Sequence, residues 1–194
     1  GPYLIQLDIR QESGRHRSVL TAITQMLEIG DYSLWPESKR VKWLQHELSS
    51  PRPLIPWEHH LDCDDREVLD TFKVIAATPP AALGAYVISM ASTPSDVLAV
   101  QLLLKSTGCS EQMPVVPLFE TLADLESASA VVNTLLEDPA YLARIDKKLM
   151  VMIGYSDSAK DAGMLAAGWA QYQAQEALLN ICEKHSVALT LFHG

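Results

Sequence analysis

The sequence of 194 residues predicts a helix-rich α/β fold of five parallel strands joined by helical crossovers. Short apolar runs alternate with longer stretches of helical periodicity, which is the pattern of strand–helix–strand units. Successive strands in the second half lie roughly 30 to 38 residues apart, the size of one such unit. Because parallel strands need crossover connections, and these are almost always right-handed, the units should build one sheet.

The first half of the chain is predicted to hold one strand and about three helices. The strand is expected at Leu4–Ile9 and the helices at Arg17–Ile29, Glu37–Leu48 and Asp64–Ala77. Gly30 ends the first helix, and Pro36 lies near the first turn of the second. The third helix is amphipathic, with Val68 and Phe72 on its apolar face.

Regular alternation of strands and helices characterises the second half. Strands are expected at Tyr86–Met90, Pro114–Phe119, Leu149–Ile153 and Val187–Phe192, and helices at Val97–Lys105, from Thr121 to about Glu137 and from Asp161 to about Lys184. Thr93 and Pro94 have the residue types of a helix cap and a first helical position. We therefore expect one domain over residues 1–194, with a strand and extra helices in 1–83 and regular strand–helix units in 84–194.

Composition and charge exclude several classes of function. A net charge of −9 argues against sequence-independent nucleic-acid binding, which needs a basic surface. No segment reaches the roughly 18 uncharged apolar residues of a membrane span, and Gly1–Arg10 lacks the pattern of a signal peptide. The cysteines Cys63, Cys109 and Cys182 are far apart and odd in number, which indicates a reducing compartment rather than a disulfide framework.

The stretch Val151–Gly163 carries the greatest density of reactive side chains. The apolar run Leu149–Ile153 is typical of a strand buried on both faces, and Gly154 ends it. Asp157 and Lys160 follow, just before the predicted helix. A carboxylate and a lysine between a buried strand and a helix N-terminus are typical of an anionic-ligand site. An ordinary loop with solvated polar residues is the alternative interpretation.

Four predicted strands end with, or are directly followed by, a residue whose side chain can bind a ligand or take part in catalysis. These residues are Arg10, Glu120, Asp157 and His193. In a parallel barrel the strand ends converge on one face, where such enzymes place their sites. Glu120 and Asp157 offer two oxygen ligands for Mg²⁺ or Mn²⁺, and Arg10 and Lys160 offer positive charge for phosphate or carboxylate. Each residue alone is more often a helix cap or an ion-pair partner, but their joint recurrence favours a site.

Four short segments also stand in a characteristic order and spacing. They are Leu7–Ser13, Pro117–Thr121, Gly154–Gly163 and Phe192–Gly194. Together they resemble successive signature segments of bacterial-type phosphoenolpyruvate carboxylase, and the resemblance covers essentially the whole chain. The segment Gly-Tyr-Ser-Asp-Ser-Ala-Lys-Asp-Ala-Gly is highly specific, whereas Phe-His-Gly is weak alone. Because the family's enzyme is far longer, the chain resembles an internal piece of it.

The resemblance implies a cytoplasmic carbon–carbon lyase that fixes carbon dioxide with Mg²⁺ or Mn²⁺ and without biotin. Its partners would be phosphoenolpyruvate and bicarbonate, which give oxaloacetate and phosphate. In the family, bicarbonate attacks the phosphoryl group, and the enolate then captures the carbon dioxide released from carboxyphosphate. The family's enzymes are allosteric homo-oligomers, with a tetramer as the implied state.

The resemblance also assigns roles to individual residues. Glu120 and Asp157 would hold the metal, which stabilises the enolate oxygen as a Lewis acid. Arg10 would bind the substrate phosphate, Lys160 would lie near bicarbonate, and His193 would line the same pocket in a supporting role. A dication and fixed cations suit a reaction that develops negative charge on phosphoryl and enolate oxygens.

The same resemblance predicts an incomplete TIM-like (β/α)8 barrel, because five strands cannot close an eight-stranded one. The family's arginine-rich loop after Phe-His-Gly, an upstream essential histidine and the C-terminal inhibitor site for aspartate have no counterpart in the sequence. We therefore expect the piece alone to be inactive and to associate with itself or with the remaining segments, since strand edges and apolar helix surface stay uncovered.

Two other interpretations stay open. One is a non-catalytic fragment whose only property is folding and assembly, which would show no Mn²⁺ uptake sensitive to Glu120 or Asp157. The other is a different metal-dependent barrel lyase or aldolase that acts on pyruvate-type enolates. This second class shares the carboxylate pair but would neither need bicarbonate nor release phosphate.

Overall fold

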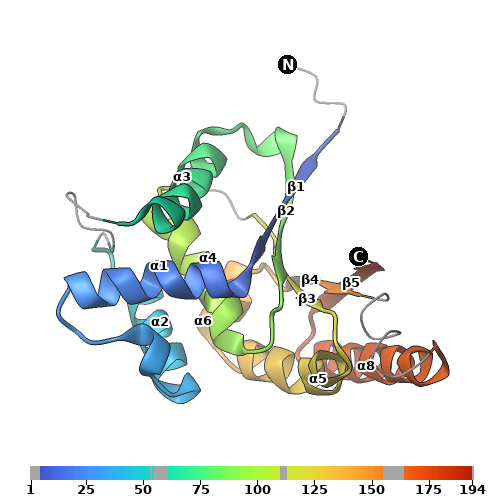
Figure 1. The fold of residues 1–194 in the computed structure, drawn as a ribbon. Coiled ribbons are helices and arrows are strands. Elements are labelled where there is room, and N and C mark those ends of the chain that lie inside the picture. Colours follow the sequence, from blue (N-terminus) through green and yellow to red (C-terminus); the bar gives the residue numbers. More distant parts are fainter. Residues whose placement is uncertain (1–4, 53, 55–60, 110–112, 155–163, 194) are drawn as a thin grey trace.

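The computed structural model describes residues 5–52, 54, 61–109, 113–154 and 164–193. Its five strands are all parallel and follow one another in sequence order across a single sheet (Figure 1). The strands are β1 (Leu7–Glu12), β2 (Leu83–Ser89), β3 (Val115–Phe119), β4 (Lys148–Ile153) and β5 (Ala188–His193). The predicted α/β fold of five parallel strands is confirmed. Among the described residues β1 and β5 do not pair, so the sheet is open, consistent with an incomplete barrel.

The described helices lie on one face of this sheet (Figure 1). They are α1 (Ser13–Met26), α2 (Glu37–Ser49), α3 (Cys63–Ala77), α4 (Pro94–Ser106), α5 (Leu122–Leu136), α6 (Pro139–Arg144) and α8 (Met164–Lys184), with 3₁₀ turns η1 (Tyr32–Leu34) and η2 (Pro80–Ala82). Helix α4 is buried nearly all round, as its sequence predicts, because α1, α2, α3, α5 and β3 all contact it.

The strands β2, β3 and β4 are apolar on both faces. Toward the helices, the main core includes Tyr86, Ile88, Val115, Phe119, Leu149 and Val151. On the opposite face, a smaller cluster contains Ala85, Val87, Val116 and Leu118, with Met150, Met152 and Phe192 packed against it. Alternate residues of a strand point to opposite faces, so β2, β3 and β4 have the composition of strands covered on both sides. In the described part, helices cover only one of those sides (Figure 1).

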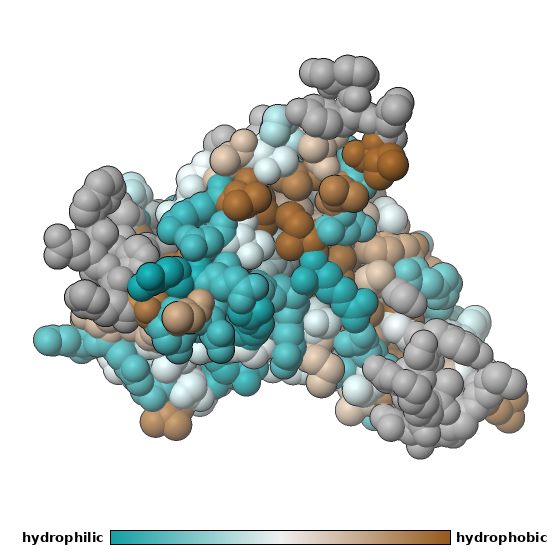
Figure 2. Space-filling view, turned by 45° about the horizontal axis from the view of Figure 1, so that its top comes forward, coloured by the Kyte–Doolittle hydropathy of each residue, from teal (hydrophilic) through white to brown (hydrophobic). Residues whose placement is uncertain are grey.

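Apolar surface is also exposed near the N-terminal end of the described chain. Ile5 and Leu7 are 72% and 67% exposed beside the open edge of β1. Figure 2 shows apolar surface in the upper part of the molecule and a broad hydrophilic surface over the helices on the left. An exposed strand edge with apolar side chains is a surface on which another segment can pair.

The first strand and helix differ in position from the prediction. The apolar pattern places the strand at Leu4–Ile9, but β1 runs from Leu7 to Glu12, and Leu4 lies outside the described residues. Pairing with β2 continues through the polar end, with Arg10 opposite Val87. Backbone ladder bonds do not depend on side-chain polarity, so Arg10 lies inside the strand rather than after it.

Most other boundaries shift by a few residues. Helix α1 starts at Ser13 and ends at Met26, earlier at both ends than the predicted Arg17–Ile29. Strand β2 starts at Leu83, before the predicted Tyr86. Helix α6 was not predicted, although Asp138 accepts from the N–H of Ala140 at 2.8 Å and Pro139 occupies the first turn, which are ordinary signals of a helix start.

Asp8 takes the place of a backbone acceptor between β1 and β2. Its Oδ1 accepts from the N–H of Ala85 at 2.8 Å, where the register shifts between Leu7 and Ile9. A Cβ atom on Gly84 would collide with this oxygen. Glycine at position 84 therefore leaves the space that the irregular pairing needs.

Gly84→Ala should lower the free energy of unfolding by about 1–2 kcal/mol, because the new methyl group displaces the Asp8 carboxylate from Ala85. Urea unfolding followed by circular dichroism measures this cost. In an Asp8→Ala background the same substitution should cost clearly less, since the colliding oxygen is absent. An equal cost in both backgrounds would contradict the assignment.

His16 is completely buried and completes a chain of hydrogen bonds between α1, β2 and β1. Its Nε2 lies 2.7 Å from the Tyr86 hydroxyl, which donates to Gln11 Oε1 at 3.0 Å. Because the single hydroxyl proton goes to Gln11, His16 Nε2 is the donor and Nδ1 is an acceptor without a partner among the described residues. Burial, with a smaller contribution from Arg15, lowers the pKa of His16 to about 3.

The low pKa of His16 predicts loss of stability in acid. The unfolded state takes up a proton below the ordinary pKa of about 6.5, whereas the folded state does not, so stability is present above that pH and falls toward pH 3. Between pH 6.5 and pH 4, the free energy of unfolding should fall by up to about 3 kcal/mol less in His16→Gln than in the parent chain. Urea unfolding at both pH values measures it, with His46→Gln on the exposed side of α2 as the control.

Candidate active site

The carboxyl ends of the five strands meet at one edge of the sheet. Phe119 is opposite Ile153, and Ile153 is opposite His193, so the ends of β3, β4 and β5 are level. Glu12 of β1 is likewise opposite Ser89 of β2. This edge is where open and closed parallel sheets both place their ligands.

Glu120, the residue directly after β3, lies at the centre of the contacts on this edge. Its side chain is 15% exposed, and its Oε1 accepts from Arg10 Nη2 at 2.7 Å. Its Oε2 accepts a longer bond of 3.4 Å from the backbone N–H of Met90, which follows β2. The structure thus brings the predicted residues Arg10 and Glu120 together, and one carboxylate contacts β1 and the residue after β2 from the end of β3.

Arg10 reaches Glu120 from within β1, two strands away. The side chain is 50% exposed, so the guanidinium stays accessible from solvent while one nitrogen holds the carboxylate. A planar guanidinium with further donors can bind a phosphate or carboxylate in two places at once. The pair therefore combines an anion-binding group with an oxygen ligand.

Gly154 allows the ends of β3 and β4 to approach closely. Its N–H donates to Phe119 O at 2.9 Å, and a Cβ atom at this position would lie 3.1 Å from both Cα and Cγ of Glu120. On the other side, the buried Gln171 of α8 donates its side-chain amide to Gly154 O at 3.0 Å. The end of β4 is therefore fixed against Glu120 by backbone and side-chain contacts.

The other predicted site residues are placed only in part. His193 is the exposed last residue of β5, and β4 separates it from Glu120 in the sheet order. Asp157 and Lys160 lie outside the described residues, so the predicted carboxylate pair is described at Glu120 alone. Within the described ranges, no group of three or more His, Cys, Asp and Glu side chains is suited to hold a metal ion.

The chemistry of Glu120 fits one ligand of an oxygen-binding cation. Mg²⁺ commonly takes one or two protein carboxylates and completes its shell with water and substrate. Among the described residues, Oε1 accepts from Arg10 at 2.7 Å and Oε2 accepts the longer bond from Met90 at 3.4 Å. The described edge thus supplies one carboxylate, each of whose oxygens has a donor.

Sequence analysis did not single out Ser13, Met90 or Gln171 as parts of this edge. Met90 was predicted as the end of a strand, but it follows β2 in the left-handed region, with a φ of 55°. Ser13 Oγ donates to Met90 O at 2.8 Å. Non-glycine residues seldom adopt this conformation, so no local pattern predicts it. Ser13 lies within the segment Leu7–Ser13, which resembles a family signature. This resemblance was the one feature of the sequence that pointed to Ser13.

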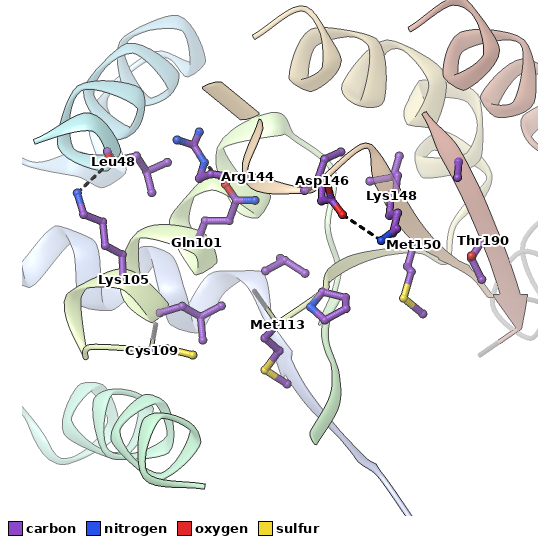
Figure 3. A pocket seen from close by; sticks show the side chains of 16 residues that line it. Leu48, Gln101, Lys105, Cys109, Met113, Arg144, Asp146, Lys148, Met150 and Thr190 are labelled. Atoms are coloured by element: carbon purple, nitrogen blue, oxygen red, sulfur yellow. Dashed lines mark hydrogen bonds and ion pairs between the residues drawn. The ribbon is translucent and has the colours of Figure 1, made fainter. Parts of the chain in front are cut away.

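A cavity of about 600 Å³ lies at the opposite edge, where β3, β4 and β5 begin (Figure 3). Three of its side chains are basic: Lys105 donates to Leu48 O at 2.8 Å, Arg144 Nε to Gln101 at 3.2 Å, and Lys148 to Asp146 at 3.0 Å. Among the described residues, Arg144 Nη2 has no hydrogen-bond partner. Because the cavity opens at the amino ends of the strands, it is not part of the edge that carries Arg10 and Glu120.

The whole chain, residues 1–194, matches the family model described as phosphoenolpyruvate carboxylase. It is 56% identical over 194 residues to the phosphoenolpyruvate carboxylase of Stutzerimonas stutzeri, 57% to that of Pectobacterium carotovorum and 56% to that of Pseudomonas aeruginosa. Each match covers 100% of this chain and 22% of the relative, so the chain spans about a fifth of the length of these relatives. No helix in the described part has the length and apolarity to cross a membrane.

Gly154→Ala should destabilise the chain by about 1–3 kcal/mol, because the backbone of Glu120 cannot move away from the added methyl group without breaking the ladder. Thermal unfolding followed by circular dichroism measures the effect. Gly168→Ala is the matched control: it lies exposed in α8 with nothing within 4 Å of a Cβ atom, and helix propensity should make it stabilising. Equal stability of Gly154→Ala and the parent chain would refute the close approach.

Proposed function

The chain belongs to the phosphoenolpyruvate carboxylase family, and we propose that it forms part of the catalytic barrel of a cytoplasmic carboxylase that joins bicarbonate to phosphoenolpyruvate. The observation that supports this most directly is the contact between Arg10 and Glu120 at the strand ends, where a phosphate-binding group meets a metal-binding group. Residues 1–194 would be one partial-barrel domain of an oligomeric, allosterically controlled enzyme, a tetramer by family analogy.

Arg10 and Glu120 would act together when substrate binds. Arg10 holds Glu120 Oε1 at 2.7 Å, and a phosphate oxygen of phosphoenolpyruvate would compete for the same guanidinium. Glu120 then keeps its bond to Met90 and gains a free oxygen as a ligand for Mg²⁺ or Mn²⁺. When bound, the cation supplies Lewis-acid stabilisation to negative charge that develops on the enolate oxygen. Substrate and metal binding are thereby linked through one ion pair.

The remaining roles are those that the resemblance to the family implies. Asp157, after β4, would be the second carboxylate, and Lys160 would hold the negative charge of bicarbonate. His193, at the end of β5, would line the same pocket. The position of Gly154 supports this arrangement, because the end of β4 lies against Glu120. Bicarbonate attack on the phosphoryl group and capture of carbon dioxide by the enolate would both occur at this edge.

The test is a chimera in which this chain replaces the matching 22% of the Pseudomonas aeruginosa enzyme. We expect oxaloacetate formation that requires phosphoenolpyruvate, bicarbonate and Mg²⁺, measured by coupled NADH oxidation, and none from the 194-residue chain alone, whose described sheet is open. Glu120→Gln should lower kcat at least about 100-fold, because a charged oxygen ligand is lost.

Glu126→Gln on the exposed side of α5 is the matched control and should leave the rate unchanged. An inactive chimera, turnover that does not depend on bicarbonate, or full activity of Glu120→Gln would each contradict the proposed function. Turnover without phosphate release would instead point to another lyase that acts on pyruvate-type enolates.

A further inference from the structure

Met90 occupies an uncommon backbone conformation beside Glu120. Its φ of 55° lies in the left-handed region, and its side chain is 51% exposed, so packing of that side chain does not explain the conformation. For a non-glycine residue this region is unfavourable and persists where surrounding contacts enforce it. The N–H of Met90 is 3.4 Å from Glu120 Oε2.

Ser13 supplies the contact that enforces this conformation. It is the first residue of α1, 5% exposed, and its hydroxyl donates to Met90 O at 2.8 Å. The N–H of Met90 belongs to the peptide group before this residue, and the C=O that accepts from Ser13 belongs to the peptide group after it. By holding the C=O, Ser13 keeps Met90 in the left-handed region in which its N–H faces Glu120 Oε2.

The hydroxyl of Ser13 does not serve the start of its own helix. The N-cap of α1 is Glu12, which makes no side-chain capping bond, and Ser13 Oγ points across to the residue after β2. A buried hydroxyl used in this way connects the start of α1 to the edge that carries Glu120. Its role is therefore tertiary rather than local.

We propose that Ser13 is a positioning residue, which fixes Glu120 Oε2 through the backbone of Met90 and thereby sets the metal affinity of this edge. The inference rests on the proposed function, in which Glu120 is a metal ligand. When Arg10 releases Oε1, the bond from Met90 is the contact that keeps the carboxylate oriented. Removal of the Ser13 hydroxyl leaves Met90 free to relax to an ordinary conformation and turns its N–H away.

The experiment uses the chimera described above and measures the dissociation constant of Mn²⁺ by isothermal titration calorimetry without substrate, besides the Mn²⁺ activation constant and kcat. Ser13→Ala should raise the dissociation constant and the activation constant about three- to tenfold, the value of one hydrogen bond, with a smaller change in kcat. Ser13→Thr, which keeps the hydroxyl, should lie closer to the parent than Ser13→Ala does. Thr24→Val is the matched control, because Thr24 is also buried in α1 and donates its hydroxyl to a carbonyl, Thr21 O, at 3.0 Å.

If Ser13 had a merely structural role, Ser13→Ala would lower the midpoint temperature of unfolding. The activation constant measured well below that temperature would not change. The proposal is overturned if Ser13→Ala leaves the activation constant unchanged, or if Ser13→Ala and Thr24→Val shift it equally. In both cases the parent chimera still turns over, so the proposed function stands. A parent chimera without turnover overturns the proposed function, and this inference with it.

Discussion

The parallel pairing of β3 with β4 is the constraint on which the candidate site depends. Phe119 lies opposite Ile153, and the ladder continues by one bond from Gly154 N–H to Phe119 O at 2.9 Å. This bond brings the backbone of Glu120 against a residue that has no side chain. A Cβ atom at position 154 would lie 3.1 Å from Glu120 Cα, closer than side chains ordinarily approach, so the position of the carboxylate depends on backbone geometry before any charge is considered.

Hydrogen bonds and an ion pair then orient the Glu120 carboxylate that the backbone has placed at this edge. Glu120 receives a guanidinium from β1 and a peptide N–H from the end of β2, so each of its oxygens has a donor from a different strand. The two donors differ in kind, because the Arg10 side chain is half exposed and can turn to another anion, whereas the Met90 N–H belongs to the backbone. A donor on a movable side chain is thus combined with one that moves only with the backbone.

The fold follows closely from local patterns, but the site does so only in part. Apolar runs bounded by glycine and proline locate four strands to within a few residues, since burial between helices requires those runs. The predicted position of β1 was wrong, because pairing with β2 extends the strand through its polar end. The local sequence pattern does not indicate this pairing. Arg10 and Glu120 could be predicted from strand ends, whereas the link between Ser13 and Met90 depends on a tertiary contact. Asp157 and Lys160 stay predictions.

The open sheet leaves one apolar face, and the edge that carries Arg10 beside it, exposed to solvent. The cluster of Ala85, Val87, Val116 and Leu118 lies on the face that no described helix covers, and the Arg10 side chain beside it is 50% exposed. Water at such an edge screens charges, since electrostatic interactions strengthen as solvent is excluded. Cover over this apolar face would therefore stabilise the fold and strengthen the interaction between Arg10 and Glu120 together.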